Sequence, residues 1–258
     1  MGSEASKQAV LAVIDEATGR RNQVHRVLAQ GDLVVTHATA TLPDGGQAAA
    51  FDLWRITDGR ITGHWGDHEP IVAQTANGHT QIDGATDIDP AADTQATRTQ
   101  VEDTVRTILV DNDFSDLERY LAGESYIQHN PRFADGISGL TAALDELAKA
   151  GQSLKYSEVL DIVAEGNFGY TRSQGVLAGT EFVFHDLFRV LDFRNQNQVW
   201  GLGDNLVKIF QTQRDLVDPH HALAAEEIDR AKGIAHEQAR GSFLANMHGI
   251  FEIKDHAI

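Results

Sequence analysis

An aspartate lies in the middle of an apolar strand face in the second half of the chain. Phe184, Asp186, Phe188 and Val190 alternate along this predicted strand, so their side chains share one face. Apolar surroundings disfavour the charged form of a carboxyl group, and the resulting rise in its pKa suits a general acid or base near neutral pH. The pattern therefore predicts Asp186 as a catalytic residue, with Phe184 and Phe188 beside it in a pocket. The alternative is a structural carboxylate that binds backbone amides or an arginine.

A second aspartate holds the same place in an earlier strand. Asp52 shares a predicted face with Ala50, Trp54 and Ile56. We expect Asp52 and Trp54 to line a secondary pocket. The structural alternative applies to Asp52 as well, because perturbed carboxylates are only statistical markers of functional sites.

The segment 126–131 carries three further candidates. In a short strand, Tyr126 and Asn130 point to one side and His129 to the other. Tyr126 or Asn130 is suited to bind a developing oxyanion, and His129 is suited to act as a general base. The alternative is that these side chains form hydrogen bonds that orient the turn at Pro131.

Histidines and acidic residues of the first half form another set. His37 and His64 are expected on neighbouring strands, as secondary pocket residues together with Asp67. The run 64–69 contains metal-ligating residue types, but ligand type alone does not create coordination geometry. Acid-rich turns are also common in so acidic a chain. We therefore expect no metal ion and no cofactor.

An internal repeat organises the strands that carry these residues. Residues 25–66 match residues 160–201 with one-residue shifts that fall in turns. The matched positions are Gly31 with Gly166, Asp52-Leu53-Trp54-Arg55 with Asp186-Leu187-Phe188-Arg189, and Trp65-Gly66 with Trp200-Gly201. Each copy predicts consecutive antiparallel strands joined by turns, and Trp200 becomes a further secondary pocket candidate.

Turn and capping signals bound the elements. The strands predicted in the first copy lie near residues 23–29, 33–42, 47–56 and 60–65. Thr57-Asp58-Gly59-Arg60 is a hairpin signal. Before the second copy, capping boxes at Thr99 and Ser115 predict two helix starts, and apolar residues from Leu140 to Leu147 predict a third helix. Helices followed by a sheet of long strands are typical of an α+β fold.

Four segments follow from the repeat and the composition. They are a first unit at 1–72, a linker or surface strap at 73–97, a complete second unit at 98–210, and a helical extension at 211–258. The first unit lacks the opening helices of the second, and a half-covered sheet is not expected to be stable alone. We therefore expect residues 219–251 to complete the first unit.

Charge and composition exclude several classes of function. The net charge is −17, which repels phosphate backbones and anionic membranes, so we expect no nucleic-acid and no membrane partner. The chain has no cysteine, which excludes disulfides, zinc–thiolate sites and iron–sulfur clusters. No secretory signal and no membrane span is predicted, so the cytoplasm is the expected location.

Several motifs carry a resemblance to a known family. They are Tyr126-Ile127-Gln128-His129-Asn130-Pro131, Ala134-Asp135-Gly136, Gly31–His37, Phe51–Arg55, Asp58–Ile61 and Gly63-His64-Trp65. These motifs resemble SnoaL-like (polyketide cyclase-like) proteins of the nuclear transport factor 2-like superfamily. One departure is that the family's His-Trp-Asp motif becomes His64-Trp65-Gly66-Asp67 in the first copy, and a one-residue slip turns a strand side chain to the other face. In the second copy, Val199-Trp200-Gly201 has no histidine, and the next aspartate is Asp204.

The resemblance implies two cone-shaped units, each a curved antiparallel sheet wrapped around helices over an apolar pocket. It implies a cofactor-free acid/base enzyme on a small apolar carbonyl compound, catalysing an aldol-type cyclisation, an isomerisation or a dehydration as an isomerase or lyase. Fold alone does not fix function, so two alternatives stay open: a non-catalytic binding protein for a hydrophobic small molecule, and a scaffold for protein partners. A homodimer or an internal pseudo-dimer is expected because related folds pair through their sheets.

Overall fold

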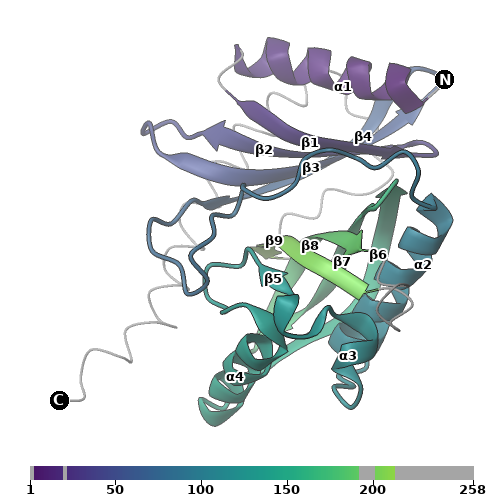
Figure 1. Ribbon diagram of the computed structural model, residues 1–258. Helices are drawn as coiled ribbons and strands as arrows, with labels where there is room; N and C mark the ends of the chain where they lie inside the picture. Colours follow the sequence, from purple (N-terminus) through teal and green to yellow (C-terminus); the bar gives the residue numbers. More distant parts are fainter. Residues whose placement is uncertain (1–2, 20–21, 192–200, 213–258) are drawn as a thin grey trace.

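The chain folds into two antiparallel sheets with helices on their outer sides (Figure 1). The computed structural model describes residues 3–19 and 22–191 in full and residues 201–212 by their backbone. Within these residues the fold is α+β, as the sequence predicts. Trp200 and the predicted helical extension after residue 212, which is expected to complete the first unit, lie outside the described residues.

The first sheet contains four consecutive antiparallel strands in the order β1-β2-β3-β4. The N-terminal elements are α1 (Ser3–Thr18), β1 (Gln23–Gln30), β2 (Leu33–Thr41), β3 (Gln47–Thr57) and β4 (Arg60–Pro70). The predicted strands are confirmed, although β4 runs five residues further than expected. Asp58 and Gly59 both have positive φ values, 50° and 76°, which is the conformation that a two-residue hairpin turn requires.

Helix α1 covers the outer face of the first sheet. Val10 and Ile14, on one side of the helix, pack against Val34, Trp54 and Ile56 of β2 and β3. These residues form a separate apolar cluster, and in Figure 1 the helix lies along the sheet on the side away from the rest of the molecule. Burial of this face ties the N-terminal helix to the sheet.

The second sheet has the order β5-β9-β8-β7-β6, in which only β5 pairs in parallel. Its strands are β5 (Ile127–Gln128), β6 (Leu154–Glu165), β7 (Phe168–Leu177), β8 (Thr180–Leu191) and β9 (Gly201–Thr212). The helical elements are α2 (Thr94–Thr104), the π-helical turn η1 (Val105–Val110), α3 (Leu117–Tyr120), the 3-10 turn η2 (Gly123–Ser125) and α4 (Gly136–Lys149). Strands β6 to β9 repeat the consecutive hairpin order of β1 to β4.

The capping box at Thr99 predicts a helix start six residues too late, whereas the box at Ser115 predicts the start of α3 to within one residue. Helix α2 begins at Thr94, because the Asp93 side chain accepts hydrogen bonds from the backbone N–H groups of Gln95 and Ala96 at 2.9 and 3.1 Å. Thr99 therefore lies inside the helix, and the predicted strap loses its last residues to α2. Helix α3 begins at Leu117 and has no side-chain cap.

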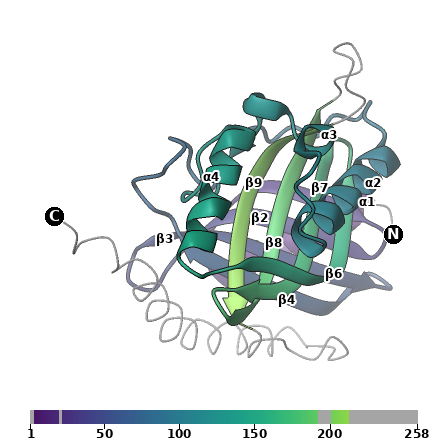
Figure 2. The ribbon, with the colours of Figure 1, turned by 90° about the horizontal axis from the view of Figure 1, so that it is seen from below.

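The helices α2, α3 and α4 lie across one face of the second sheet, which we call the helix-covered face (Figure 2). The core between them contains Val101, Val105, Leu140, Tyr156 and Phe184 among its buried members. Close approach of helix and sheet is possible because Gly169 of β7 has no side chain where Val101 of α2 packs.

The opposite face of the second sheet packs against the first sheet. Phe51, Leu53 and Trp65 of the first sheet form one buried cluster with Tyr170 and Leu187 of the second. The molecule is therefore layered as α1, first sheet, second sheet and α2–α4, as Figures 1 and 2 show.

Polar contacts reinforce this packing at its edge. The Glu165 carboxylate on β6 binds Lys7 Nζ of α1 at 2.6 Å and accepts the Ala29 N–H of β1 at 2.7 Å. Between the sheets, the Tyr170 hydroxyl lies 2.7 Å from His185 Nδ1. Burial, followed by the nearby Arg172 charge, lowers the pKa of His185 to about 3, so this imidazole is neutral at physiological pH.

Residues 71–93, which we call the strap, lead from β4 to α2 and pack on the body of the molecule. The buried Arg26 guanidinium donates to the backbone carbonyls of Ile82, Asp83 and Ala85. Gln81 is fully buried. The predicted strap is therefore an ordered part of the fold and not a loose linker.

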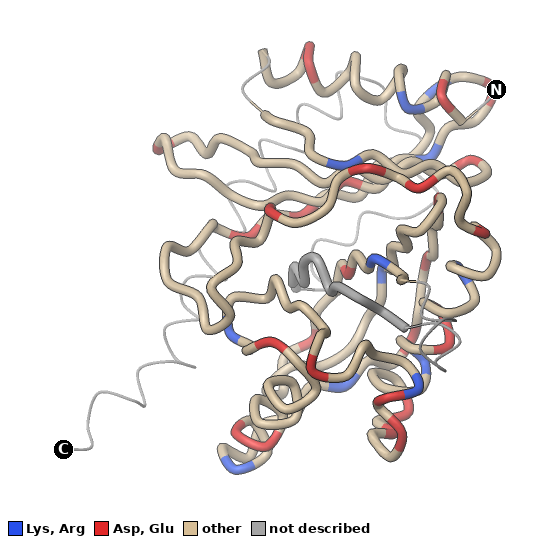
Figure 3. The backbone as a smooth tube through the Cα atoms, viewed as in Figure 1, with Lys and Arg blue, Asp and Glu red and all other residues tan. Residues whose placement is uncertain are grey.

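Acidic residues are spread over the strap, the strands and the helices, with few basic residues between them (Figure 3). None of the helices in the described part of the chain has the length and apolar character needed to cross a membrane.

Candidate functional site

Asp186 lies inside the molecule, on the helix-covered face of β8. Its side chain alternates with Phe184 and Phe188, which both belong to the core under the helices, and it is 0% exposed. The Tyr156 hydroxyl of β6 donates to Asp186 Oδ2 at 2.8 Å. Phe184 stacks on the Tyr156 ring, with centroids 4.3 Å apart. The expected aspartate in an apolar strand face is thus found, with a phenol as its partner.

The Tyr156 phenol is held in its protonated form. Burial is the main cause that raises its pKa well above the ordinary value, and the neighbouring Asp186 adds to the shift. A protonated phenol is a hydrogen-bond donor at neutral pH. Tyr156 and Asp186 therefore form a fixed donor–acceptor pair in surroundings of low polarity.

Two hydroxyl groups lie on the same face without hydrogen-bond partners among the described residues. Thr171 pairs with Asp186 across β7 and β8, and Ser173 follows two positions later, so both point to the helix-covered face. Both side chains are fully buried, and Thr171 Oγ1 and Ser173 Oγ have no partner there. Buried polar atoms without a partner are rare and call for an explanation such as a bound molecule or water.

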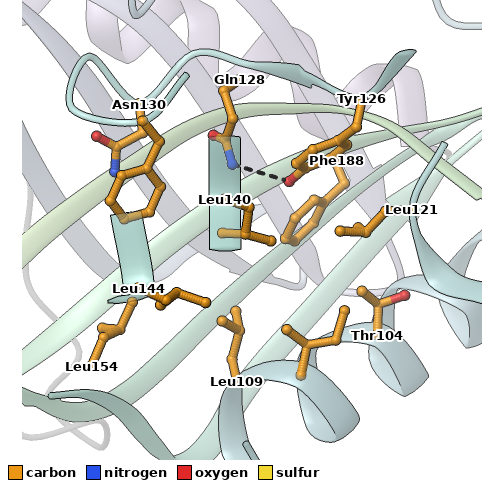
Figure 4. A pocket seen from close by; sticks show the side chains of 12 residues that line it. Thr104, Leu109, Leu121, Tyr126, Gln128, Asn130, Leu140, Leu144, Leu154 and Phe188 are labelled. Atoms are coloured by element: carbon orange, nitrogen blue, oxygen red, sulfur yellow. Dashed lines mark hydrogen bonds between the residues drawn. The ribbon is translucent and has the colours of Figure 1, made fainter. Parts of the chain in front are cut away.

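A pocket opens beside this region, between the second sheet, the β5 segment and the helices (Figure 4). It is lined by Thr104, Ile108, Leu109, Leu121, Tyr126, Gln128, Asn130, Phe133, Leu140, Leu144, Leu154 and Phe188. The cavity has a volume of about 30 Å³, and the space between these side chains, including open solvent at the mouth, is about 510 Å³. This room accommodates a few water molecules or one small polar group.

The polar part of the pocket comes from the segment around β5. Tyr126, Gln128 and Asn130 all line it, which confirms the predicted alternation. Gln128 Nε2 makes a long bond of 3.5 Å to the Tyr126 hydroxyl (Figure 4), and Gln128 Oε1 is buried without a partner among the described residues. This amide oxygen is an acceptor available to a molecule in the pocket.

Asp186 and Tyr156 are not among the residues that line the pocket. Of the predicted apolar neighbours, Phe188 lines it, whereas Phe184 is buried against Tyr156. Side chains of the core thus separate the carboxylate from the pocket in this conformation.

His129 and Asn130 have structural contacts. Asn130 Oδ1 accepts the Arg132 N–H at 3.0 Å, which is the turn-orienting bond of the alternative interpretation. His129 points away from the pocket, and its Nδ1 lies 2.7 Å from Asp83 Oδ1 and 3.1 Å from the Thr80 carbonyl oxygen. Of the three candidates in this segment, Tyr126 and Asn130 line the pocket, whereas His129 does not.

The first sheet carries a carboxylate–imidazole pair on the face under α1. Asp52 Oδ1 lies 2.6 Å from His64 Nε2, and the His64 ring stacks on Trp54 with centroids 3.8 Å apart. A Cβ at Gly66, the strand neighbour of Asp52, would overlap the Asp52 carboxylate. The pair therefore depends on the glycine at position 66.

His37 and Asp67 lie on the other face of the first sheet. The expectation that His37 and His64 occupy neighbouring strands is wrong, because β3 separates β2 from β4. His37 stacks on Phe51 and contacts Arg26, and burial together with that charge lowers the pKa of its imidazole. Asp67 alternates with His64 and Gly66, so the one-residue slip turns its carboxylate away from them, as predicted.

Tyr156, Thr171 and Ser173 are not among the site residues predicted from the sequence. Tyr156 stands before two register shifts in β6, which break the simple alternation of the strand. Thr171 is the strand neighbour of Asp186 in the β7–β8 hairpin. Pairing the two predicted strands across their turn would have identified it from the sequence.

One group in the described residues has the ligand types and the proximity that a metal ion needs, namely His79, Asp83 and His129. His79 and Asp83 lie in the strap, and His129 directly follows β5.

Comparison with protein-family models gives no match for this chain, and comparison with curated proteins gives none either.

Proposed function

We propose that this chain is a cofactor-free acid/base enzyme that binds a small, largely apolar carbonyl compound under the helices of the second sheet. The observation that carries the proposal is the buried Tyr156–Asp186 pair, set in an apolar strand face next to two hydroxyls that have no hydrogen-bond partner among the described residues. Perturbed titratable groups in apolar surroundings are a recurrent feature of acid/base sites.

In the proposed reaction, Asp186 takes a proton from the carbon next to the carbonyl group. The enolate oxygen then accepts a hydrogen bond from Tyr126, which lines the pocket, or from one of the Thr171 and Ser173 hydroxyls. Tyr156 holds Asp186 in place through its hydroxyl. Gln128 Oε1 receives a hydroxyl or N–H group of the ligand. Cyclisation, isomerisation and dehydration all begin with such a proton transfer.

The proposal requires the pocket to deepen when the ligand binds. Phe188 reaches the pocket and is two residues from Asp186 on the same strand face, so a shift of its ring is the shortest route to the carboxylate. Leu109, Phe133 and Leu144, which are only partly buried, are the side chains that can yield at the mouth.

We further propose that the two sheets belong to two nuclear transport factor 2-like units that resemble SnoaL-like proteins. Two observations support this proposal. Strands β1–β4 and β6–β9 have the same order in their sheets. Thr36 also pairs with Asp52 in the first sheet as Thr171 pairs with Asp186 in the second. The face-to-face packing of the sheets supports an internal pseudo-dimer. A homodimer is the alternative to this internal pseudo-dimer, and we also propose a cytoplasmic location.

The second candidate is a binding protein without turnover. The observation that favours it is the absence of Asp186 and Tyr156 from the pocket lining. In that case the pocket deepens in the same way, its apolar side chains hold the body of the ligand, and Tyr126 and Gln128 bind the polar group of the ligand.

The two candidates are separated by Asp186→Asn, tested with small cyclic ketones and hydroxyketones as ligands. Binding is measured by shifts of protein NMR signals, with Gln128→Leu as the control that weakens binding. Loss of turnover with retained binding in Asp186→Asn supports the enzyme. Turnover that is undetectable in the wild type while binding is detected supports the binding protein. Absence of binding for all these ligands would contradict both.

A further inference from the structure

A cluster of two histidines and two aspartates joins the strap to the segment around β5. His79 Nδ1 lies 3.8 Å from Asp83 Oδ2, and His129 Nδ1 lies 2.7 Å from Asp83 Oδ1. One nitrogen of each imidazole and one carboxylate oxygen all lie within 4.8 Å of one another. We propose that His79, Asp83 and His129 bind a divalent transition-metal ion of the zinc class.

The spacing of these atoms is close to that of a zinc site. Zinc–nitrogen and zinc–oxygen bonds of about 2.0–2.2 Å place tetrahedral ligand atoms about 3.4 Å apart. The observed separations lie on both sides of this value, so a small rotation of the half-exposed His79 ring brings the set together. The Thr80 carbonyl oxygen, 3.1 Å from His129 Nδ1, is in reach as a fourth ligand.

The outer contacts of His79 match those of a metal ligand. Its Nε2 lies 3.4 Å from Asp135 Oδ2, and Asp135 Oδ1 accepts the backbone N–H of Gln128 at 2.8 Å. Histidines that bind metals with one nitrogen usually donate the other N–H to a carboxylate or carbonyl group, which fixes the tautomer. Asp135 thus orients His79 so that its Nδ1 faces Asp83.

A plain histidine–aspartate hydrogen bond explains less of the arrangement. It would account for the contact between His129 and Asp83, but not for the convergence of His79 on the same carboxylate with its own orienting aspartate. Two imidazoles and one carboxylate select zinc-class ions over calcium and magnesium, which prefer oxygen ligands. The net charge of −17 also favours a bound cation.

An ion at this position would fix one wall of the pocket. His129 stands between Gln128 and Asn130, whose side chains line the pocket from the other side of the segment. The strap already contacts this wall through Asn77 Nδ2, which donates to the carbonyls of Asn130 and Phe133. The role assigned to the ion is structural, and it does not depend on the reaction proposed above.

The test uses the full chain, treated with a chelator and dialysed, and Zn²⁺ alone as the probe. We expect calorimetric titration to give a site of one ion per chain that raises the midpoint of thermal unfolding. His79→Gln and Asp83→Asn should each weaken Zn²⁺ binding at least tenfold. Loss of a residue that only orients a ligand typically lowers metal affinity by about 10–100-fold, and loss of a ligand itself should lower it by no less. His25→Gln, a partly buried histidine bonded to Thr39 in the first sheet, is the matched control and should leave binding unchanged.

The half-exposed His79 can be replaced without disturbing the core, so we expect His79→Gln to fold. The test therefore remains decisive even if replacement of the buried His129 prevents folding. With Co²⁺ in place of Zn²⁺, the visible absorption should indicate nitrogen and oxygen ligands and should be lost in His79→Gln. The proposal is overturned if the chain binds no Zn²⁺, or if His79→Gln and Asp83→Asn bind it as tightly as the wild type, because the ion would then lie at other histidines.

Discussion

Removal of one buried hydroxyl should reveal how much the Tyr156–Asp186 pair contributes to stability. Tyr156→Phe leaves the ring and its stacking on Phe184 in place and removes only the donor at 2.8 Å from Asp186. Hydrogen bonds to charged groups contribute about 1.5–3 kcal/mol to the free energy of unfolding. We therefore expect a loss of about 2–3 kcal/mol, measured by urea unfolding at pH 7.5. Tyr120→Phe, whose partly buried hydroxyl accepts a bond of 3.3 Å from Thr107, is the control and should cost less.

The same variant has a signature at high pH. Burial raises the pKa of Tyr156 in the folded protein above its value in the unfolded chain. The unfolded chain therefore loses this proton first, so the free energy of unfolding is unaffected below a pH of about 10 and falls as the pH rises further. Each phenol of this kind lowers the free energy of unfolding by about 1.4 kcal/mol per pH unit in this range. Burial also raises the pKa of Tyr170, so Tyr170 supplies a second such contribution. Tyr156→Phe should remove one of these two contributions. Unchanged stability at pH 7.5 together with an unchanged slope above pH 10 would refute the buried pair.

Three other changes probe the positions that hold the layers together. His185, whose pKa burial lowers to about 3, stays neutral while the unfolded imidazole gains a proton, so stability should decline from pH 6.5 towards pH 3 by an amount on the order of 4 kcal/mol. Denaturant unfolding should show a flatter decline in His185→Gln, and an identical pH profile would contradict this burial. Gly66→Ala should cost about 1–3 kcal/mol through overlap with the Asp52 carboxylate. The cost should shrink in an Asp52→Ala background, and equal costs would show that the overlap is not the cause. Glu165→Ala should cost about 2 kcal/mol, because it leaves the Ala29 N–H without its acceptor and Lys7 with only the exposed Glu4 as a partner, whereas Glu146→Ala at an exposed pair should change little. Thermal unfolding compares the two, and similar effects would refute a structural role of Glu165.

Local patterns predicted the strands well. The strands of the first sheet, their hairpin turn at Asp58-Gly59 and the third helix from Leu140 to Leu147 follow from period-two alternation, turn residues and apolar spacing. These signals act within a few residues of the chain. The same is true of the strand face that carries Asp186, which depends only on alternation.

Features that depend on distant contacts could not be predicted in this way. Helix α2 starts at Thr94, because the Asp93 side chain accepts hydrogen bonds from the first backbone N–H groups of the helix. The capping-box pattern at Thr99 lies inside the helix and does not mark its start. The partner of Asp186 comes from β6, thirty residues away in the sequence, behind shifts of register. The His79–Asp83–His129 cluster depends on where the strap packs, and no periodicity in the strap specifies that position.

Exchange of the protons next to a carbonyl group with solvent deuterium reports most directly on the proposed chemistry of Asp186. Small cyclic ketones that bind the protein are incubated in D₂O, and NMR follows the loss of the proton signal from the carbon next to the carbonyl group. We expect the wild-type protein to accelerate exchange of at least one bound ketone over buffer, and Asp186→Asn to bind that ketone without accelerating its exchange. Exchange at the buffer rate for every bound ketone, or equal acceleration by Asp186→Asn, would contradict a role of this carboxylate as the base.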